Sequence, residues 1–181
     1  ACEETQFGER LHGASRPSRT PRSPGRFQES IGADATIGAA MLIHGKCHCG
    51  NIRFSLTWAP DPTEIPARAC SCSFCVKHGG VWTSNPKGAL EISLEDPSLV
   101  SRYAFGTRTA EFHVCARCGI VPVVTSRIDG RLYAVVSVNA FEGVDPSLLR
   151  RAPASFDGEG TDSRLARRQR SWIPHVSYTA G

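Results

Sequence analysis

Hydrophobic and polar residues alternate over short segments of the chain, which is the pattern of a β-strand with one buried face. Ile52, Phe54 and Leu56 are separated by single polar residues. Residues 90–94 repeat this pattern, with Leu or Ile at every second position. No stretch shows the 3.6-residue period of a long amphipathic helix. The pattern therefore predicts strands at both places and little helix.

Turn residues separate further pairs of expected strands. Two hairpin-like pairs are predicted: residues 100–105 with 110–114, and residues 120–125 with 132–138. The second connection contains Asp129-Gly130, and an Asp-Gly pair between two apolar runs is a strong hairpin signal. An N-cap residue followed by proline at Asp145-Pro146 predicts one short helical turn near residues 145–150. Together these signals predict an all-β core over roughly residues 42–145.

Both ends of the chain differ from this core. Residues 1–40 are rich in Pro, Ser, Gly and Arg without periodicity, so we expect a disordered or non-native extension, with Met41 as the natural start. Cys2 lies in this extension and is expected to be a free thiol without a role. The folded domain is expected to span residues 41–150. Residues 151–181 are expected to form a loose C-terminal segment, whose Arg-rich run is interpreted as a solvated tail or a short exposed helix.

Charge and hydropathy bear on whether this chain has a nucleic-acid or a membrane partner. The net charge of +4 is too small to indicate nucleic-acid binding by itself. No apolar run approaches the roughly 20 residues of a membrane-spanning helix. We therefore expect neither a nucleic-acid nor a membrane partner, and we expect a cytoplasmic protein. The sequence indicates no oligomeric state.

Seven of the eight cysteines fall into three tight clusters, and these clusters carry the chemistry of the sequence. They are Cys47-His48-Cys49, Cys70-Ser71-Cys72-Ser73-Phe74-Cys75 and Cys115-Ala116-Arg117-Cys118. Cysteines one or two residues apart can direct both sulfurs at one point, which suits a metal ion better than a disulfide. A reducing compartment would favour the same choice. Disulfide pairing in a secreted scaffold is the alternative.

The outer pairs, Cys47/Cys49 and Cys115/Cys118, are far apart in sequence and together supply four thiolates. Four thiolates around Zn²⁺ make a closed tetrahedral site of the structural kind. Such a site would join the start of the domain to its middle and would add folding free energy. We predict a structural zinc at these four residues.

The middle cluster supplies three sulfurs, Cys70, Cys72 and Cys75, from one short loop. Three thiolates leave one corner of tetrahedral zinc open for water or an incoming thiol, and an open corner is typical of a catalytic site. Lys77 and His78 follow directly, and a cation there would favour thiolates and attract an anionic substrate. Ordinary loop polarity explains these two residues equally well.

The order and spacing of these motifs resemble one known family. The chain reads Gly45-Lys46-Cys47-His48-Cys49-Gly50, then Cys70-x-Cys72-Ser73-x-Cys75-x-Lys77-x-Gly79, then Cys115-x-x-Cys118-Gly119. This succession is similar to the glutathione-dependent formaldehyde-activating enzymes, a family that also includes centromere protein V. The resemblance covers roughly residues 42–140 and implies a β-tent of small antiparallel sheets. It likewise implies two zinc ions per chain, a structural one at the outer pairs and a catalytic one at the middle cluster.

The resemblance implies a zinc-dependent carbon–sulfur lyase or synthase that joins glutathione and formaldehyde into S-(hydroxymethyl)glutathione. A second hypothesis is a non-catalytic zinc-binding module similar to centromere protein V, in which the run Arg164–Arg170 contacts an acidic polymer. A third is the same fold acting on another small thiol or electrophile. The residues that would hold the glutathione carboxylates are candidates only by charge: Arg53, Arg68, Arg102 and Arg108.

Overall fold

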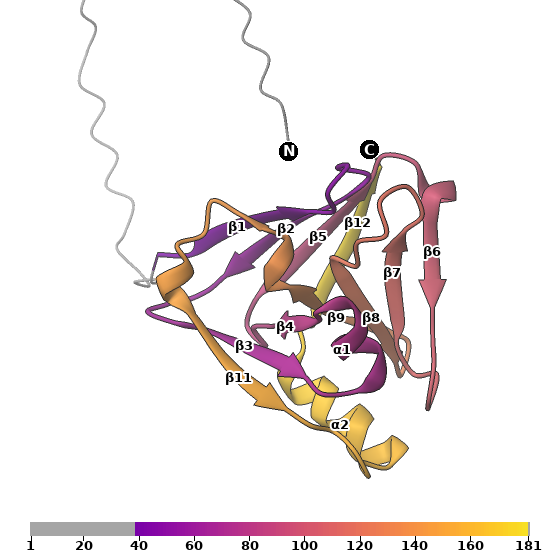
Figure 1. Ribbon diagram of the computed structural model, residues 1–181. Coiled ribbons are helices and arrows are strands. Elements are labelled where there is room, and N and C mark those ends of the chain that lie inside the picture. The colour runs from indigo at the N-terminus through magenta and orange to yellow at the C-terminus, as the bar shows by residue number, and fades with distance from the viewer. Residues whose placement is uncertain (1–38, 181) are drawn as a thin grey trace, which may run out of the picture. The chain divides into compact units, whose positions relative to one another are not determined.

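The computed structural model describes residues 39–180, which lie within one compact unit. The expected extension at residues 1–40 lies almost wholly outside the described part, as does Cys2. The described chain forms two β-sheets, and the prediction of a mostly β fold is confirmed (Figure 1).

The first sheet has five strands in the order β10-β1-β2-β5-β12. These strands are β1 (Met41–Lys46), β2 (Ile52–Trp58), β5 (Ala89–Leu94), β10 (Phe141–Glu142) and β12 (His175–Ala180). The alternation seen in the sequence places Ile52, Phe54 and Leu56 on the buried face of β2. Phe54 lies opposite Ile92 of β5, so the two alternating segments form one apolar surface in the core.

The second sheet has seven strands in the order β11-β3-β4-β9-β8-β7-β6. These strands are β3 (Ile65–Cys70), β4 (Val81–Thr83), β6 (Val100–Tyr103), β7 (Glu111–Cys115), β8 (Val123–Ile128), β9 (Arg131–Ser137) and β11 (Leu149–Ala154). Both expected hairpins are present, since β6 pairs with β7 and β8 pairs with β9, each antiparallel. Asp129 and Gly130 have φ values of 49° and 79°, as a two-residue turn with a right-handed twist requires.

Two helices, α1 (Ser73–His78) and α2 (Thr161–Ser171), and three 3₁₀ turns complete the described chain. The 3₁₀ turns span Pro97–Leu99, Val138–Ala140 and Pro146–Leu148. The last of these is the turn expected near residue 145, and Asp145 caps it by accepting a hydrogen bond from the Ser147 amide. Within residues 39–180, no helix has the length and apolar character needed to cross a membrane.

The structure departs from expectation after residue 150. We expected a loose segment there, but these residues complete β11, form α2 and end in β12. We expected antiparallel sheets, but β11 pairs with β3 in parallel and β12 pairs with β5 in parallel. Parallel partners are joined by long crossovers rather than by a local turn, so no short-range pattern announces them.

Candidate metal centres and the adjoining cavity

The four outer cysteines meet in the structure. Cys47 follows β1 directly and Cys115 ends β7, while Cys49 and Cys118 lie in the turns that follow. The four Sγ atoms all lie within 4.8 Å of one another. The Sγ atoms of Cys47 and Cys49 are 3.7 Å apart, and those of Cys49 and Cys115 are 3.4 Å apart. Zn–S bonds of about 2.3 Å in a tetrahedron put sulfurs about 3.8 Å apart, so the arrangement fits a zinc ion.

The position of this four-thiol set explains how it would act on the fold. Cys47 and Cys49 lie between strands of the five-stranded sheet, and Cys115 and Cys118 lie between strands of the seven-stranded sheet. A bound ion would therefore join the two sheets. The amide of Ile52 already donates to the Cys47 sulfur at 3.3 Å, an interaction that favours the thiolate.

Burial works against ionisation in the four-thiol set. Cys47 is fully buried, and this burial raises the pKa of its thiol to about 12. A metal ion must therefore displace the proton of the Cys47 thiol when it binds. All seven described cysteines of the two sets are free thiols.

The three cysteines of the middle cluster also meet. Cys70 ends β3, Cys72 is the N-cap residue of α1 and Cys75 lies within α1. Their Sγ atoms lie within 4.8 Å of one another, as three ligands of one ion require. The indole N–H of Trp82 donates to the Cys75 sulfur at 3.2 Å, and the Cys75 amide points at the Cys72 sulfur at 3.5 Å. The hydrogen bond between Cys70 and Cys75 lowers the pKa of the Cys70 thiol, while the same bond and burial raise the pKa of the Cys75 thiol.

The residues after the three-thiol set have structural roles. Gly79 ends α1 in the left-handed conformation with φ of 68°. Gly80 is buried against the site, and an added Cβ would lie 3.1 Å from the Cys75 sulfur. Lys77 and His78 are both exposed at the end of α1, where cations are favoured.

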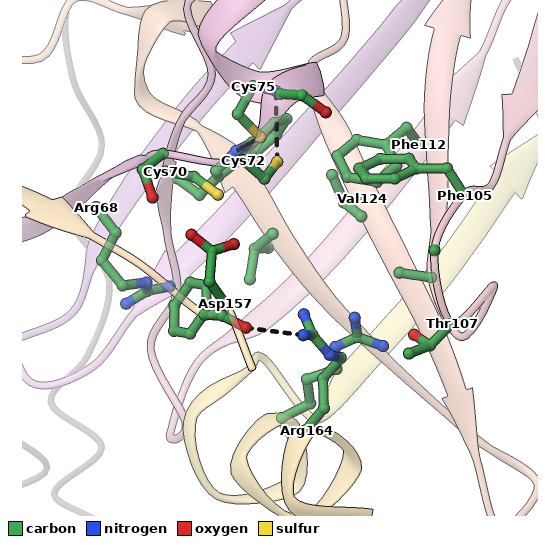
Figure 2. Close-up of a pocket in the computed structure, with 18 of the residues that line it drawn as sticks. Arg68, Cys70, Cys72, Cys75, Phe105, Thr107, Phe112, Val124, Asp157 and Arg164 are labelled. Carbon is green, nitrogen blue, oxygen red and sulfur yellow. Dashed lines mark hydrogen bonds between the residues drawn. The ribbon is translucent and has the colours of Figure 1, made fainter. Parts of the chain in front are cut away.

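A cavity of about 540 Å³ opens beside the three-thiol set. Cys70, Cys72 and Cys75 line one part of it, and Asp157 is the carboxylate among the lining residues (Figure 2). Much of the wall is apolar, and the large side chains are Trp82, Phe105, Phe112, Val124, Val135, Phe156 and Trp172. A concave, largely apolar wall with a few convergent polar groups is typical of a small-molecule site.

Of the four arginines proposed from charge, Arg68 lines the cavity. The other three do not belong to its lining: Arg53 lies near Glu95, Arg102 pairs with Glu111, and Arg108 lies on the turn before β7.

Sequence reasoning missed two cavity residues, Arg164 and Arg168, which lie on α2. They were assigned to a solvated run, yet Arg168 is 7 % exposed. A usable signal was present, because Arg164, Arg168 and Trp172 are spaced four residues apart and so share one helix face. The signal was weak in isolation, since nothing nearby in sequence showed that this face would be covered.

Comparisons with known proteins agree with the motif pattern. The family model described as “Glutathione-dependent formaldehyde-activating enzyme” matches residues 42–150. A protein of Halomonas elongata named “Putative glutathione-dependent formaldehyde-activating enzyme” is 34 % identical over 85 residues, which cover 43 % of this chain and 52 % of that protein. The chain thus spans about half the length of this relative. A crystal structure of a Rhodobacter sphaeroides protein has 29 % identity and a TM-score of 0.40, and the match covers 57 % of this chain and 92 % of that one.

The family match extends over more than half of the chain and includes all seven clustered cysteines. The chain belongs to the glutathione-dependent formaldehyde-activating enzyme family.

Proposed function

We propose that this family member is a zinc-dependent enzyme that forms or breaks a carbon–sulfur bond between a thiol and formaldehyde. Glutathione, which would give S-(hydroxymethyl)glutathione, is the first thiol to test. The alternative substrate is the formaldehyde adduct of a related thiol. The observation that carries the proposal is the three-thiol set of Cys70, Cys72 and Cys75, which opens onto a cavity of about 540 Å³.

The proposal assigns different roles to the two cysteine sets. The four-thiol set would hold a structural zinc, because it offers a complete tetrahedron and is largely buried. The three-thiol set would hold the catalytic zinc. Zinc bound there would act as a Lewis acid and would stabilise a thiolate or polarise an aldehyde oxygen.

The cavity residues would supply positioning and proton transfer. In the synthetic direction the thiol loses its S–H proton, a C–S bond forms, and the aldehyde oxygen gains a proton, so the net proton count does not change. Asp157 can take the proton from sulfur and return it to oxygen, since its carboxylate points toward Cys70 (Figure 2). The aromatic and aliphatic wall would exclude water and hold the two reactants close together.

The alternative of a non-catalytic binding module is less well supported by the position of the Arg-rich run. A phosphate-binding role requires these side chains to face solvent. Arg168 is instead buried, and Arg164 and Arg167 approach Glu159 at 3.9 Å and 2.8 Å. Arg170 remains exposed. We also propose a reducing compartment such as the cytoplasm, where thiolate sites of this kind persist.

The test is to measure zinc per chain and the rate of adduct formation in matched variants. Uncatalysed addition of thiols to formaldehyde is easy, so NMR magnetisation transfer should compare exchange rates with and without protein. Cys72→Ser is expected to lose one zinc per chain and the acceleration while keeping the fold. Cys115→Ser is expected to lose the other zinc and to unfold the domain, because structural zinc contributes about 10 kcal/mol or more.

Two outcomes would contradict the proposal. If Cys72→Ser lowers the melting temperature as much as Cys115→Ser does, the three-thiol set is structural rather than catalytic. If the wild-type protein holds two zinc ions but accelerates no thiol–formaldehyde exchange, the metal sites are present and the proposed enzymatic activity is wrong.

A further inference from the structure

The cavity carries more positive charge than the described residues neutralise. Its lining contains Arg68, Arg164 and Arg168, against Asp157 as the carboxylate. Glu159 lies close by, but it already pairs with Arg164 and with a further arginine of α2. Within residues 39–180, neither Arg68 nor Arg168 forms an ion pair. Buried cations are normally paired, so these two arginines are suited to receive the anionic group of a ligand.

Arg168 is held in place by neutral groups. Its Nη1 donates to the carbonyl oxygen of Thr109 at 2.9 Å, to the hydroxyl of Thr109 at 2.8 Å and to the hydroxyl of Ser126 at 3.2 Å. Its Nη2 has no hydrogen-bond acceptor in the part of the chain that the structure describes, and its Nε, which is fully buried, has none either. Burial and the neighbouring Arg167 and Arg164 lower the pKa of Arg168 to about 10. The guanidinium is therefore fixed in position, and its Nη2 and Nε can still donate hydrogen bonds.

Arg68 approaches the same space from β3. Its Nη2 donates to the hydroxyl of Ser84 at 2.8 Å, and Ser84 donates to the carbonyl oxygen of Ser171 at 2.7 Å. This chain of bonds joins β3 to the end of α2. Figure 2 shows Arg68 and Arg164 pointing toward the cavity from these two elements. Arg68 and Arg168 thus both line the cavity, and neither pairs with a carboxylate of the described residues.

The rest of the wall is largely apolar, with Ser71, Ser73, Thr107 and Asp157 as its polar residues. Seven of the lining residues are aromatic or valine, and Trp172 packs under the Arg168 guanidinium at 4.9 Å from its ring centre. Glutathione carries two amides and an ammonium group in addition to its two carboxylates. Polar groups that enter such a wall without partners cost binding free energy. An apolar body with one acidic end fits both the wall and the unpaired arginines.

We propose that the cavity binds a thiol whose body is apolar or aromatic and whose far end carries a carboxylate, with Arg168 as its hydrogen-bond donor and Arg68 as a second positive charge on the cavity wall. This proposal rests on the proposed function, because the thiol sulfur would face the three-thiol set. Residues 156–172 lie beyond the segment that the family model matches, residues 42–150, and supply Phe156, Arg168 and Trp172. Arg68 and the other five large apolar side chains of the wall lie within the matched segment. The preferred thiol would thus depend on both parts of the chain.

The test measures binding to the zinc-loaded protein by isothermal titration calorimetry. The probes are 4-(sulfanylmethyl)benzoate, the matching carboxamide, glutathione and the thiol-free 4-methylbenzoate. We expect the carboxylate thiol to bind about tenfold to a hundredfold more tightly than the carboxamide, as for hydrogen bonds to a charged group. We also expect it to bind more tightly than glutathione.

Matched variants assign the effect to the two arginines. Arg168→Gln and Arg68→Gln are each expected to remove most of the difference between carboxylate and carboxamide, and Arg168→Lys is expected to keep part of it. Arg170→Gln, on the exposed side of the same helix, should change nothing. Near-UV circular dichroism identifies a variant that misfolds. If Arg168→Gln misfolds, Arg68→Gln tests the carboxylate preference instead. Arg68 makes one side-chain hydrogen bond, to Ser84, so its replacement should disturb the fold less.

Equal binding of carboxylate and carboxamide would overturn the inference, and so would tighter binding of glutathione. The same holds if the preference survives both arginine substitutions. The thiol-free probe separates this inference from the proposed function. If 4-methylbenzoate binds in an Arg168-dependent way while no thiol–formaldehyde exchange is accelerated, the anion site stands and the activity fails. If exchange is accelerated without any carboxylate preference, the activity stands and the anion site fails.

Discussion

The substitution Gly80→Ala tests whether the three-thiol set depends on the close packing behind it. An added Cβ at Gly80 would lie 2.9 Å from Trp82 Nε1, 3.0 Å from Cys75 Cβ and 3.1 Å from Cys75 Sγ. The indole must move to relieve this overlap, and its N–H is the group that donates to the Cys75 sulfur at 3.2 Å. Overpacking of this kind costs about 1–3 kcal/mol.

This cost should fall on the metal site, because the added Cβ would contact both the candidate ligand Cys75 and the indole that donates to its sulfur. Since 1.4 kcal/mol corresponds to a factor of ten, zinc affinity at the three-thiol set should fall about tenfold to a hundredfold. Titration with a chromogenic chelator measures this, because the more weakly held zinc is released first. The four-thiol set makes no contact with Gly80 in the structure and should release its zinc unchanged.

Gly79→Ala is the matched control. No atom lies within 4 Å of a Cβ added there, but φ is 68°, so alanine costs about 1 kcal/mol of backbone strain. Gly79→Ala should therefore lower the free energy of unfolding without weakening zinc binding. If both variants weaken zinc binding equally, or if Gly80→Ala leaves it intact, the packing argument for Cys75 is wrong.

Three further predictions concern single side chains around the cavity. Asp157→Asn should lower the rate of thiol–formaldehyde exchange by about 10²-fold while zinc content stays the same, and an unchanged rate would remove Asp157 from proton transfer. Glu159→Gln should cost about 1 kcal/mol of stability at pH 7, because the carboxylate is partly exposed and accepts two hydrogen bonds from Arg167. Those bonds lower the pKa of Glu159, so their contribution is present above its unfolded-state pKa and is lost as pH falls through its folded-state pKa. Denaturant titrations of wild type and variant should therefore converge in acid, and a difference that persists there would refute the assignment. Phe156→Ala should weaken binding of 4-methylbenzoate without changing zinc content, since Phe156 lines the cavity and is not one of the candidate zinc ligands. Unchanged binding would place the ligand elsewhere.

The strands and the three-thiol set were accessible from the sequence because each depends on residues close together in the chain. Alternation along β2 follows from the two-residue period of a strand, and it placed Phe54 on the buried face. The Asp129-Gly130 turn formed as expected because its backbone needs residues that tolerate positive φ. The three sulfurs of the middle cluster meet as their spacing indicated, and the two outer pairs meet each other at a separate place. The metal and its role remain predictions.

The cavity and its charge were decided by the tertiary structure. Nothing near Arg168 in sequence indicates that it is buried, because its hydrogen-bond partners, Thr109 and Ser126, come from a distant part of the chain. The parallel pairing of β12 with β5 is equally non-local. Strand β12 follows α2 in the chain, and α2 supplies residues to the cavity lining. Local periodicity and turn chemistry thus determine the elements and the ligand clusters. Which surfaces meet, and which arginines lose their solvent, depends on packing between residues far apart in the chain.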